Sequence, residues 1–287
     1  MKDTLFSIKK TLNIKGKLVI IDKPMVMGIL NITPDSFYAG SRVTGTEAIL
    51  EKAGRMISEG ADILDIGGYS TRPDAGEVSE KGEIERVIPA IRAIQSAYPD
   101  CLLSVDTFRA SVAERAVAEG ASMVNDVSGG QLDPGMFRTI ARMNVPYILM
   151  HMRGNPKTMR LLSEYDNLFL EIAVYFNKRL NELHDLGVKD IILDVGFGFA
   201  KKIGQNYELL KNLSYFNMVG LPLLAGVSRK SMIYKTLHST ADQAMNGTTV
   251  LNTIALLKKA SILRVHDVRE TKEAITLLKR GNIDIFN

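Results

Sequence analysis

The stretch Met25–Asn31 reads Met-Val-Met-Gly-Ile-Leu-Asn, a run without charge that ends in one amide side chain. A strand with one face in water alternates apolar and polar residues, so a run without alternation predicts a strand covered on both faces. Further runs of this kind recur along the chain. The eight runs are Met25–Asn31, Ala61–Gly68, Leu102–Thr107, Met123–Ser128, Pro146–Met152, Asp190–Gly196, Pro222–Ser228 and Ser261–Val268.

Between these runs, apolar residues recur at the spacing of one helix face. Ser79 is a suitable N-cap for a helix that carries Val87 and Ile91, and Asn144 is a suitable stop signal. The other predicted helices are Glu47–Glu59, Arg109–Glu119, Pro134–Met143, Tyr165–Leu186, Asn206–Leu213, Ala241–Lys259 and Val268–Arg280.

A strand followed by a helix, repeated eight times in ~250 residues, predicts a closed (β/α)8 barrel, the TIM barrel. A doubly wound sheet would more usually carry a glycine fingerprint after its first strand, and none follows Met25–Asn31. We therefore expect one α/β domain over residues 1–287. Residues 1–22 form an extension, in which the alternation around Asn13–Gly16 predicts a β-hairpin that closes the N-terminal end of the barrel.

The composition limits the classes of function. The 36 Lys and Arg residues nearly balance the 32 Asp and Glu residues and are spread along the chain, which argues against a nucleic-acid partner. No stretch approaches the ~18 apolar residues of a membrane span, so no membrane partner is expected. Cys101 is the only cysteine and excludes an intrachain disulfide. These features predict a cytoplasmic protein.

Polar residues stand where the apolar runs end, and the carboxyl ends of barrel strands converge on one mouth. Carboxylate and amide groups there suit a flat heterocycle, whereas Arg, Lys and His suit a phosphate. The strand-end groups are Asn31, Asp65, Asp106, Asn125, Asp126, His151, Asp194, Ser228, Arg229, Lys230, Arg264 and His266. A strand-end Asp often only caps the next helix, which is the interpretation favoured for Asp65, Asp126 and Asp267.

The same positions offer no covalent catalyst. Cys101 begins its strand, at the end away from the mouth, and Ser228 has no evident base beside it. No metal cage is visible, although Asn31 could supply one oxygen to a Mg²⁺ ion held mainly by substrate phosphates and water. Two long polar segments, Thr33–Arg42 and Gly67–Gly76, follow the first two strands and are candidate lids.

The motifs along the chain resemble those of the dihydropteroate synthase family from Met27 to about Glu270. The matching motifs are Met27–Phe37 (MGILNITPDSF), Asp65–Pro73 (DIGGYSTRP), Ser104–Thr107 (SVDT), Val124–Gly130 (VNDVSGG), Met150–Met152 (MHM), Gly196–Phe199 (GFGF), Gly226–Ser231 (GVSRKS) and Arg264–Val268 (RVHDV). Some positions differ from the family's usual residues: Asp74, Arg109, Val195 and Ala200.

The resemblance implies a site and a reaction. Its pterin-binding residues would be Asp106, Asn125, Asp194 and Lys230. Its pyrophosphate-binding residues would be Asn31, Thr71, Arg72, Arg264 and His266, with Asn31 also the Mg²⁺ ligand. Its p-aminobenzoate-binding residues would be Thr71, Arg72, Pro73, Phe199, Ser228 and Lys230. The catalytic residues would be Asp106, Lys230, Arg264 and His266.

The implied enzyme is a transferase of folate synthesis and a sulfonamide target. It joins p-aminobenzoate to a dihydropterin pyrophosphate, through a stabilised carbocation and without a nucleophile. Two alternatives are a pterin-binding methyltransferase, which has no pyrophosphate to hold, and a non-catalytic pterin-binding relative. The resemblance also suggests a homodimer formed through late helices such as Ala241–Lys259, whose apolar residues are equally consistent with packing on the strands.

Overall fold

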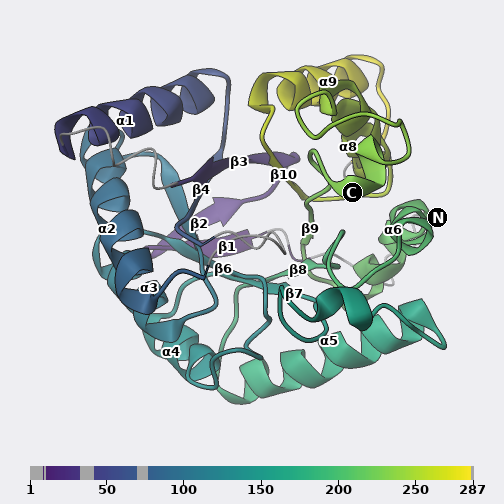
Figure 1. Cartoon of the computed structure of the whole chain (residues 1–287), viewed down its shortest axis with the longest axis horizontal. Helices are drawn as coiled ribbons and strands as arrows, with labels where there is room; N and C mark the ends of the chain where they lie inside the picture. Colours follow the sequence, from purple (N-terminus) through teal and green to yellow (C-terminus); the bar gives the residue numbers. More distant parts are fainter. Residues whose placement is uncertain (1–8, 10, 33–41, 70–76, 286–287) are drawn as a thin grey trace.

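The computed structural model describes residues 9, 11–32, 42–69 and 77–285. Eight parallel strands form a closed barrel with helices around it (Figure 1). In order around the barrel they are β10 (Ile262–Val265), β3 (Met25–Asn31), β4 (Ile63–Gly67), β5 (Leu102–Asp106), β6 (Met123–Asp126), β7 (Tyr147–Met150), β8 (Ile191–Asp194) and β9 (Leu223–Ala225). Every strand lies inside one of the predicted apolar runs, so the predicted (β/α)8 barrel is confirmed.

The helices follow the predicted order with shifted ends. They are α1 (Arg42–Ser58), α2 (Glu80–Ala97), α3 (Ala110–Ala118), α4 (Met136–Met143), α5 (Leu168–Asp185), α6 (Ile203–Lys211), α7 (Ser231–Tyr234), α8 (Met245–Leu257) and α9 (Val268–Arg280), with 3₁₀ turns at Met159–Leu161 and Leu213–Val219. Ser79 caps α2 by accepting the N–H of Gly82 at 3.1 Å, and Asn144 ends α4 at φ 52°. The sequence analysis did not predict α7, because four residues are too few for helical spacing to show.

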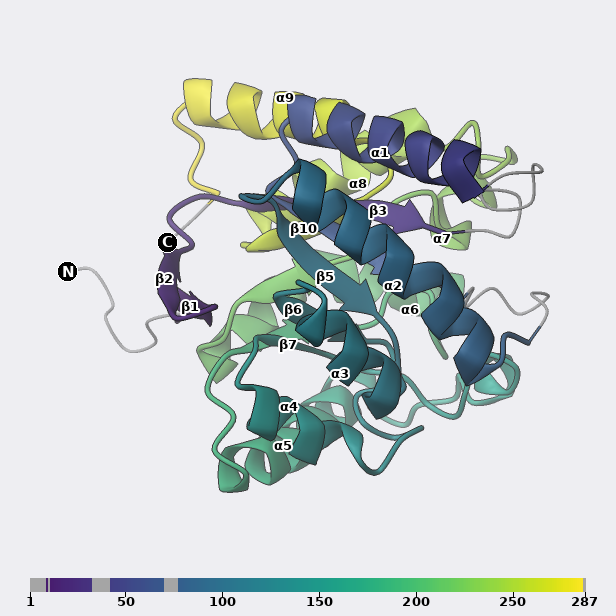
Figure 2. The ribbon, with the colours of Figure 1, turned by 90° about the vertical axis from the view of Figure 1, so that its left-hand side faces the viewer.

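The N-terminal hairpin closes one end of the barrel, as predicted. Its strands β1 (Thr11–Ile14) and β2 (Lys17–Ile20) are antiparallel, and Lys15 and Gly16 turn the chain with φ of 51° and 78°. Figure 2 shows the hairpin at the end from which the barrel strands start. Leu12 and Ile14 are buried there against the first inward residues of the barrel strands.

The barrel interior changes from apolar to polar along its axis. Side chains of a strand alternate between its two faces, so residues two apart point the same way. Next to the hairpin, the inward residues are apolar: Met27, Ile63, Met123, Ile148, Ile192, Leu224 and Ile262. Two residues further on, four of these strands present a polar group: Asp65, Asn125, Asp194 and Arg264. The polar layer therefore lies toward the carboxyl ends of the strands.

Within the ranges described, no helix is both long and apolar enough to cross a membrane.

Candidate active site

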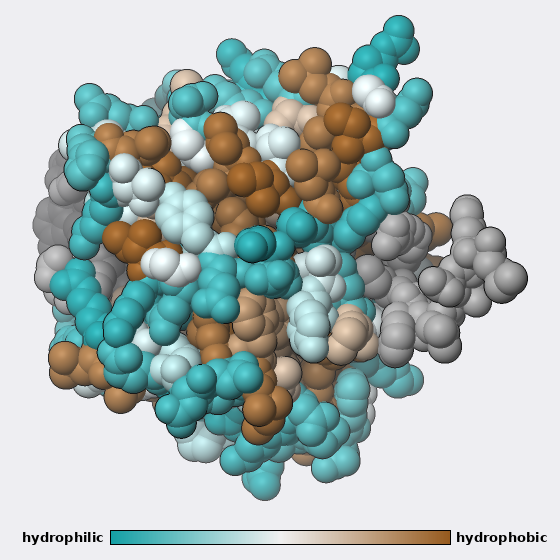
Figure 3. All heavy atoms as spheres, turned by 90° about the vertical axis from the view of Figure 1, so that its right-hand side faces the viewer, coloured by the Kyte–Doolittle hydropathy of each residue, from teal (hydrophilic) through white to brown (hydrophobic). Residues whose placement is uncertain are grey.

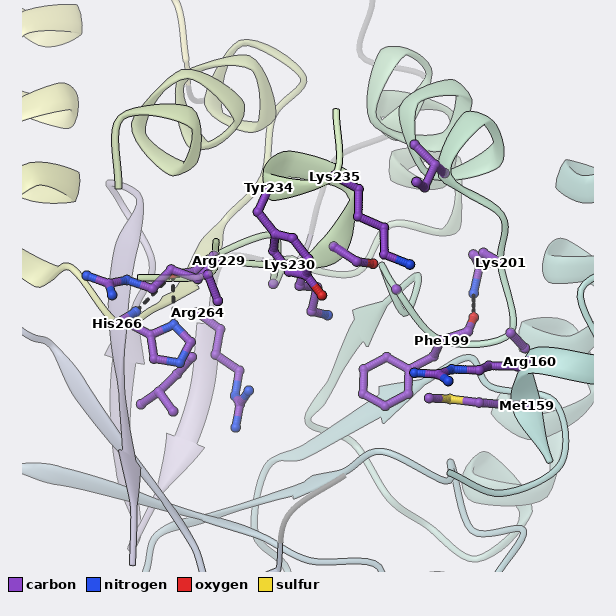
Figure 4. Close-up of a pocket in the computed structure, with 18 of the residues that line it drawn as sticks. Met159, Arg160, Phe199, Lys201, Arg229, Lys230, Tyr234, Lys235, Arg264 and His266 are labelled. Carbon is purple, nitrogen blue, oxygen red and sulfur yellow. Dashed lines mark hydrogen bonds between the residues drawn. The ribbon is translucent and has the colours of Figure 1, made fainter. Parts of the chain in front are cut away.

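A cavity of about 620 Å³ opens at the carboxyl ends of the strands. Its walls come from β3, β5 and β10 and from the segments that follow β4, β7, β8 and β9. Figure 4 shows Arg264 and His266 on one side of the cavity, Phe199 and Arg160 on the other, and Lys230 between them. The predicted site residues that line it are Asn31, Asp106, Phe199, Ser228, Lys230, Arg264 and His266.

Arg264 binds two carboxylates at the floor of the cavity. Its Nε donates to Asp65 at 2.6 Å, and its Nη2 donates to Asp106 at 2.5 Å. Burial alone would lower the pKa of Arg264, but the charges of Asp65 and Asp106 outweigh it and hold that pKa above its usual value. The guanidinium is therefore a fixed positive charge, shared between strands β4 and β5.

Asp65 is a site residue that the sequence analysis assigned wrongly to helix capping. Its side chain is fully buried, and the oxygen that accepts from Arg264 also accepts from Asn125 Nδ2 at 2.9 Å. Asp65 therefore links a predicted pyrophosphate residue with a predicted pterin residue. The signal in the sequence was its place two residues after Ile63, on the inward face of its strand.

The pKa of the Asp106 carboxyl group lies near neutral pH. Burial raises its pKa to about 7, Arg264 opposes the rise, and the nearby charge of Asp65 adds to it. The carboxylates of Asp65 and Asp106 thus share the guanidinium of Arg264, which compensates the negative charge of Asp106 only in part. A ligand that donates N–H groups would supply the missing compensation.

Lys230 and Gly226 line a second part of the floor, and Asp194 lies buried beside them. An ideal Cβ placed on Gly226 would lie 3.9 Å from an Asp194 oxygen and 3.8 Å from Lys230 Nζ, so both groups face the space above this glycine. Burial raises the pKa of Asp194 and lowers that of Lys230 to about 8, and in each case the charge of the other residue opposes the shift. Lys230 also donates to the carbonyl of Phe197.

Ser228 does have a basic group beside it, contrary to the expectation from the sequence. Its Oγ lies 3.0 Å from His266 Nδ1 and accepts the backbone N–H of His266 at 3.1 Å. Burial, followed by the charge of Arg264, lowers the pKa of His266 to about 4. His266 is therefore neutral at pH 7 rather than the cation expected. So weak a base does not activate the serine hydroxyl. When that hydroxyl donates to Nδ1, Nε2 of His266 carries the ring proton and is a hydrogen-bond donor.

Arg229 lines the cavity, as its strand-end position predicted, but its charge is paired with that of Asp267. Its Nε and Nη2 donate to both oxygens of Asp267, at 3.0 and 2.6 Å. Asp267 stands at the N-cap of α9 but makes no side-chain cap bond, so the capping prediction is wrong for it. Asp126 does bind local backbone, since it accepts the N–H groups of Ser128 and Gly130 at 2.7 and 2.8 Å.

The far wall of the cavity combines apolar side chains with the basic side chains of Arg160 and Lys202. Phe199 lies there beside Met159 and Ala200, and Lys230 Nζ is 4.8 Å from the centroid of the Phe199 ring. Thr71, Arg72, Pro73 and Asp74, as well as most of the Thr33–Arg42 segment, lie outside the described residues. Val195 is fully buried in the core, and Arg109 pairs with the buried carboxylate of Glu83.

A single predicted metal ligand lies at the mouth. Asn31 ends β3 and lines the cavity with Asp106, and its Oδ1 lies 3.4 Å from an ideal Cβ position on Gly67. In the part of the chain that the structure describes, no three His, Cys, Asp or Glu residues cluster as a metal site. One amide oxygen fits an ion whose other ligands come from phosphate and water.

The fold and the site define a barrel enzyme with a polar floor, and the family model of pterin-binding enzymes matches residues 27–266. The dihydropteroate synthase of Haemophilus influenzae is 41% identical over 262 residues, covering 91% of this chain and 94% of that protein. The chain belongs to the dihydropteroate synthase family. It is therefore a transferase of folate synthesis, as the sequence predicted.

Solved structures agree with this membership. The Yersinia pestis dihydropteroate synthase, described as a sulfonamide drug complex, matches with a TM-score of 0.87 and 40% identity over 95% of this chain and 98% of that one. The Xanthomonas albilineans enzyme, described as a complex with 7,8-dihydropteroate, matches with a TM-score of 0.84 and 36% identity over 95% of this chain and 98% of that one.

Proposed function

We propose that this chain joins p-aminobenzoate to 6-hydroxymethyl-7,8-dihydropterin pyrophosphate, giving 7,8-dihydropteroate and pyrophosphate. The observation that carries the proposal is the polar layer at the cavity floor, where Asp106 and Asp194 flank the cations Lys230 and Arg264. The compound bound to the Xanthomonas albilineans relative joins a pterin to an aminobenzoate unit, which supports a site for both substrates.

The pterin ring occupies the floor in this proposal. A pterin carries an amino group and ring N–H groups beside ring nitrogen and carbonyl acceptors. The carboxylates of Asp106 and Asp194 accept from the donors, while Asn125 and Lys230 complete the set with an amide and an ammonium. Pterin N–H groups would take the place of the Arg264 guanidinium on Asp106 and leave Arg264 on Asp65.

Arg264 and His266, on the side of the cavity opposite Phe199, hold the pyrophosphate leaving group. The bond between the pterin methylene carbon and the pyrophosphate oxygen breaks, both electrons go to the oxygen, and a cation remains on the pterin. Arg264 offers a fixed positive charge to the departing pyrophosphate, and neutral His266 offers an N–H. Such prearranged charges are commonly the largest contribution to catalysis. Asp106, when ionised, favours the cation.

The second substrate, p-aminobenzoate, lies along the wall that carries Phe199. Phe199, Ser228 and the stem of Lys230 contact the ring of p-aminobenzoate. The family resemblance implies that Thr71, Arg72 and Pro73 also take part in this binding. The neutral arylamine attacks the methylene cation with its nitrogen lone pair, which forms the carbon–nitrogen bond, and the resulting arylammonium gives one proton to the released pyrophosphate or to solvent. No basic residue is required for this step, which agrees with the weak basicity of His266. Exclusion of water protects the cation from hydrolysis.

We also propose Mg²⁺ as the cofactor, with Asn31 as its protein ligand. When bound, the ion neutralises charge on the pyrophosphate oxygens. Removal of Mg²⁺ with EDTA should abolish turnover while leaving the affinity for a bare pterin within twofold of its value with the ion. A pterin affinity that also falls by tenfold or more would place the ion in the pterin site instead.

One assay separates this function from its alternatives. Pyrophosphate release should require the pterin pyrophosphate, p-aminobenzoate and Mg²⁺ together, and a sulfonamide should inhibit it competitively with p-aminobenzoate. A pterin-binding methyltransferase would release no pyrophosphate from this substrate. A non-catalytic relative would bind the pterin without turnover.

Two variants separate the roles of the floor residues. Arg264→Ala should lower kcat at least 100-fold and leave bare-pterin affinity within about threefold, since the loss of transition-state electrostatics commonly costs 10²–10³ in rate. Asp194→Ala should do the reverse and weaken pterin binding most. If both variants lose both properties equally, the assignment of the two groups to different substrates is wrong.

We further propose that the chain forms a homodimer through α8. Thr248, Leu251 and Ala255 are buried, whereas Val250 is 50% exposed on another face of the helix. Figure 3 shows apolar side chains gathered on the side of the molecule that lies to the right in Figure 1, where α8 is drawn. Val250→Glu should convert the dimer to a monomer in light-scattering measurements. The predicted cytoplasmic location stays a prediction.

A further inference from the structure

Lys201 is a basic residue of the cavity lining that the proposed chemistry does not use. Burial lowers its pKa to about 7, and the charge of Asp194 opposes this shift. Lys201 is half-buried, and its ammonium group is turned inward to donate to the carbonyls of Gly196 and Phe199, each at 3.0 Å. It also lies 3.0 Å from His151 Nδ1. Among the residues that the structure describes, no carboxylate lies within 4.0 Å of it. Its partners are therefore backbone carbonyls and an imidazole rather than a counter-ion.

The segment that Lys201 holds has a conformation that needs outside support. Gly196, Gly198 and Ala200 have φ of 71°, 80° and 48°, the left-handed region that alanine rarely adopts. Side chains bind its backbone: Asp194 accepts the N–H of Gly196 at 2.7 Å, and Asn206 accepts that of Gly198 at 2.6 Å. The carbonyl groups of Gly196 and Phe199 accept from Lys201, and the carbonyl of Ala200 accepts from the Tyr165 hydroxyl at 3.0 Å.

His151 provides the fixed end of this contact. Its backbone belongs to the barrel wall, since its N–H donates to the carbonyl of Asp194 at 2.9 Å. Its ring is buried and packs edge-on against Tyr175 with centroids 4.9 Å apart. Burial and the charge of Lys201 keep its pKa well below the usual value, so the ring is neutral. Nδ1 can then accept an N–H of Lys201.

Phe199 is the residue whose place depends on these bonds. Its ring lines the far wall of the cavity, and its own carbonyl is one of the two held by Lys201 (Figure 4). We propose that Lys201 is a positioning residue: by tying the Phe199 segment to His151, it sets the width of the p-aminobenzoate side of the site. This inference rests on the function proposed above and adds to it a residue that determines affinity for the second substrate.

Replacement of the ammonium alone tests the proposal. Lys201→Met keeps the length of the side chain and removes all its donors. It should raise KM for p-aminobenzoate at least tenfold, leave the dissociation constant of a bare pterin within twofold, and lower kcat less than KM rises. Lys211→Met, at the exposed end of α6, is the matched control and should change neither constant.

Variants of His151 test the other end of the contact. His151→Asn can keep an acceptor near Nδ1, whereas His151→Leu cannot, so the Leu variant should raise KM for p-aminobenzoate and the Asn variant should restore most of the affinity. The Lys201→Met/His151→Leu double variant should be no worse than the more impaired single variant, because both changes break one connection. If Lys201→Met fails to fold, the Asn and Leu variants still decide the question.

Three results would overturn the inference: an unchanged KM in Lys201→Met, an equal loss of pterin affinity, or equal effects of the Asn and Leu variants. Wild-type protein that releases no pyrophosphate would instead overturn the proposed function. The two failures are therefore distinguishable.

Discussion

Asp65 connects Arg264 with Asn125 at the floor of the cavity through hydrogen bonds. Its one oxygen accepts from Arg264 and Asn125, while its other oxygen has no partner among the described residues. An asparagine could place its carbonyl at the bonded position and its amide at the other. The hydrogen bonds would persist and only the charge would be lost, whereas leucine would remove the charge and also the acceptor for Arg264 and Asn125.

We therefore expect Asp65→Asn and Asp65→Leu to differ strongly. Removal of one partner of a buried pair commonly costs about 3–5 kcal/mol, so the Leu variant should lose about that much stability and at least 100-fold in kcat. The Asn variant should lose less than about 2 kcal/mol and keep measurable turnover. Urea unfolding and pyrophosphate release measure both quantities. Equal effects of the two substitutions would show that shape, and not hydrogen bonding, is what the site needs from Asp65.

The raised pKa of Asp106 predicts a pH dependence. Burial moves it from 3.8 to about 7, so the carboxyl group is protonated below pH 7 and ionised above it. Only the anion accepts two pterin N–H groups, so bare-pterin affinity should increase as the pH rises through about 7. The folded state binds the proton more tightly than the unfolded state, so this group's stabilising contribution is lost as the pH rises from 3.8 to about 7.

Asp106→Asn should remove both trends. Calorimetric titration with a bare pterin from pH 5 to 9, with urea unfolding at the same pH values, is the measurement. A pH dependence of pterin affinity that persists unchanged in the variant would assign the titration to another group.

For single residues, the sequence predicted the place in the fold better than the hydrogen-bond partners. It placed Asp106, Lys230 and Arg264 at strand ends, and all three line the cavity. It could not show that Arg264 binds Asp65, because that contact joins residues 199 positions apart. Nor could it show the charge of His266, because burial decides that charge and burial depends on the folded surroundings.

Among the elements, the strands were the most predictable and the short connections the least. A strand covered on both faces has to be continuously apolar, so a run such as Ile191–Asp194 carries its structure in its composition. The four-residue helix α7 carries no such pattern. The bend at Gly196 and Ala200 depends on contacts with Asp194 and Lys201, which lie on either side of it and whose side chains meet it only in the fold.

Gly226 directly follows the short strand β9. We expect pterin binding to be sensitive to a methyl group added at this position. A Cβ on Gly226 meets Lys230, Arg264 and Asp194 only at 3.8 to 3.9 Å, which is ordinary contact, so Gly226→Ala should fold normally. The methyl would nevertheless stand in the space where we place the pterin. Pterin affinity should fall at least tenfold with less than about 1 kcal/mol change in stability. Normal pterin binding by this variant would place the ring elsewhere in the cavity.

The whole molecule separates stability from chemistry along the barrel axis. The hairpin closes the end where the strands begin (Figure 2). The polar floor lies toward the end where the strands finish. A substitution in the hairpin should therefore change the free energy of unfolding without reaching the substrates. The sequence predicted this arrangement because the alternation around Asn13–Gly16 leaves an apolar face that needs cover.

Leu12→Ala is the direct test of that separation. Leu12 is fully buried among residues that include Met27 and Ile148, and removal of such a side chain commonly costs about 2–5 kcal/mol through lost burial and the cavity left behind. Leu18, on the other strand of the hairpin, is 67% exposed, so Leu18→Ala should change stability by less than about 0.5 kcal/mol. Both variants should retain wild-type kcat and both KM values at 25 °C. If Leu12→Ala alters pterin affinity while the protein remains folded, the N-terminal hairpin and the cavity floor are coupled through the barrel interior. The two ends of the barrel would then not act independently.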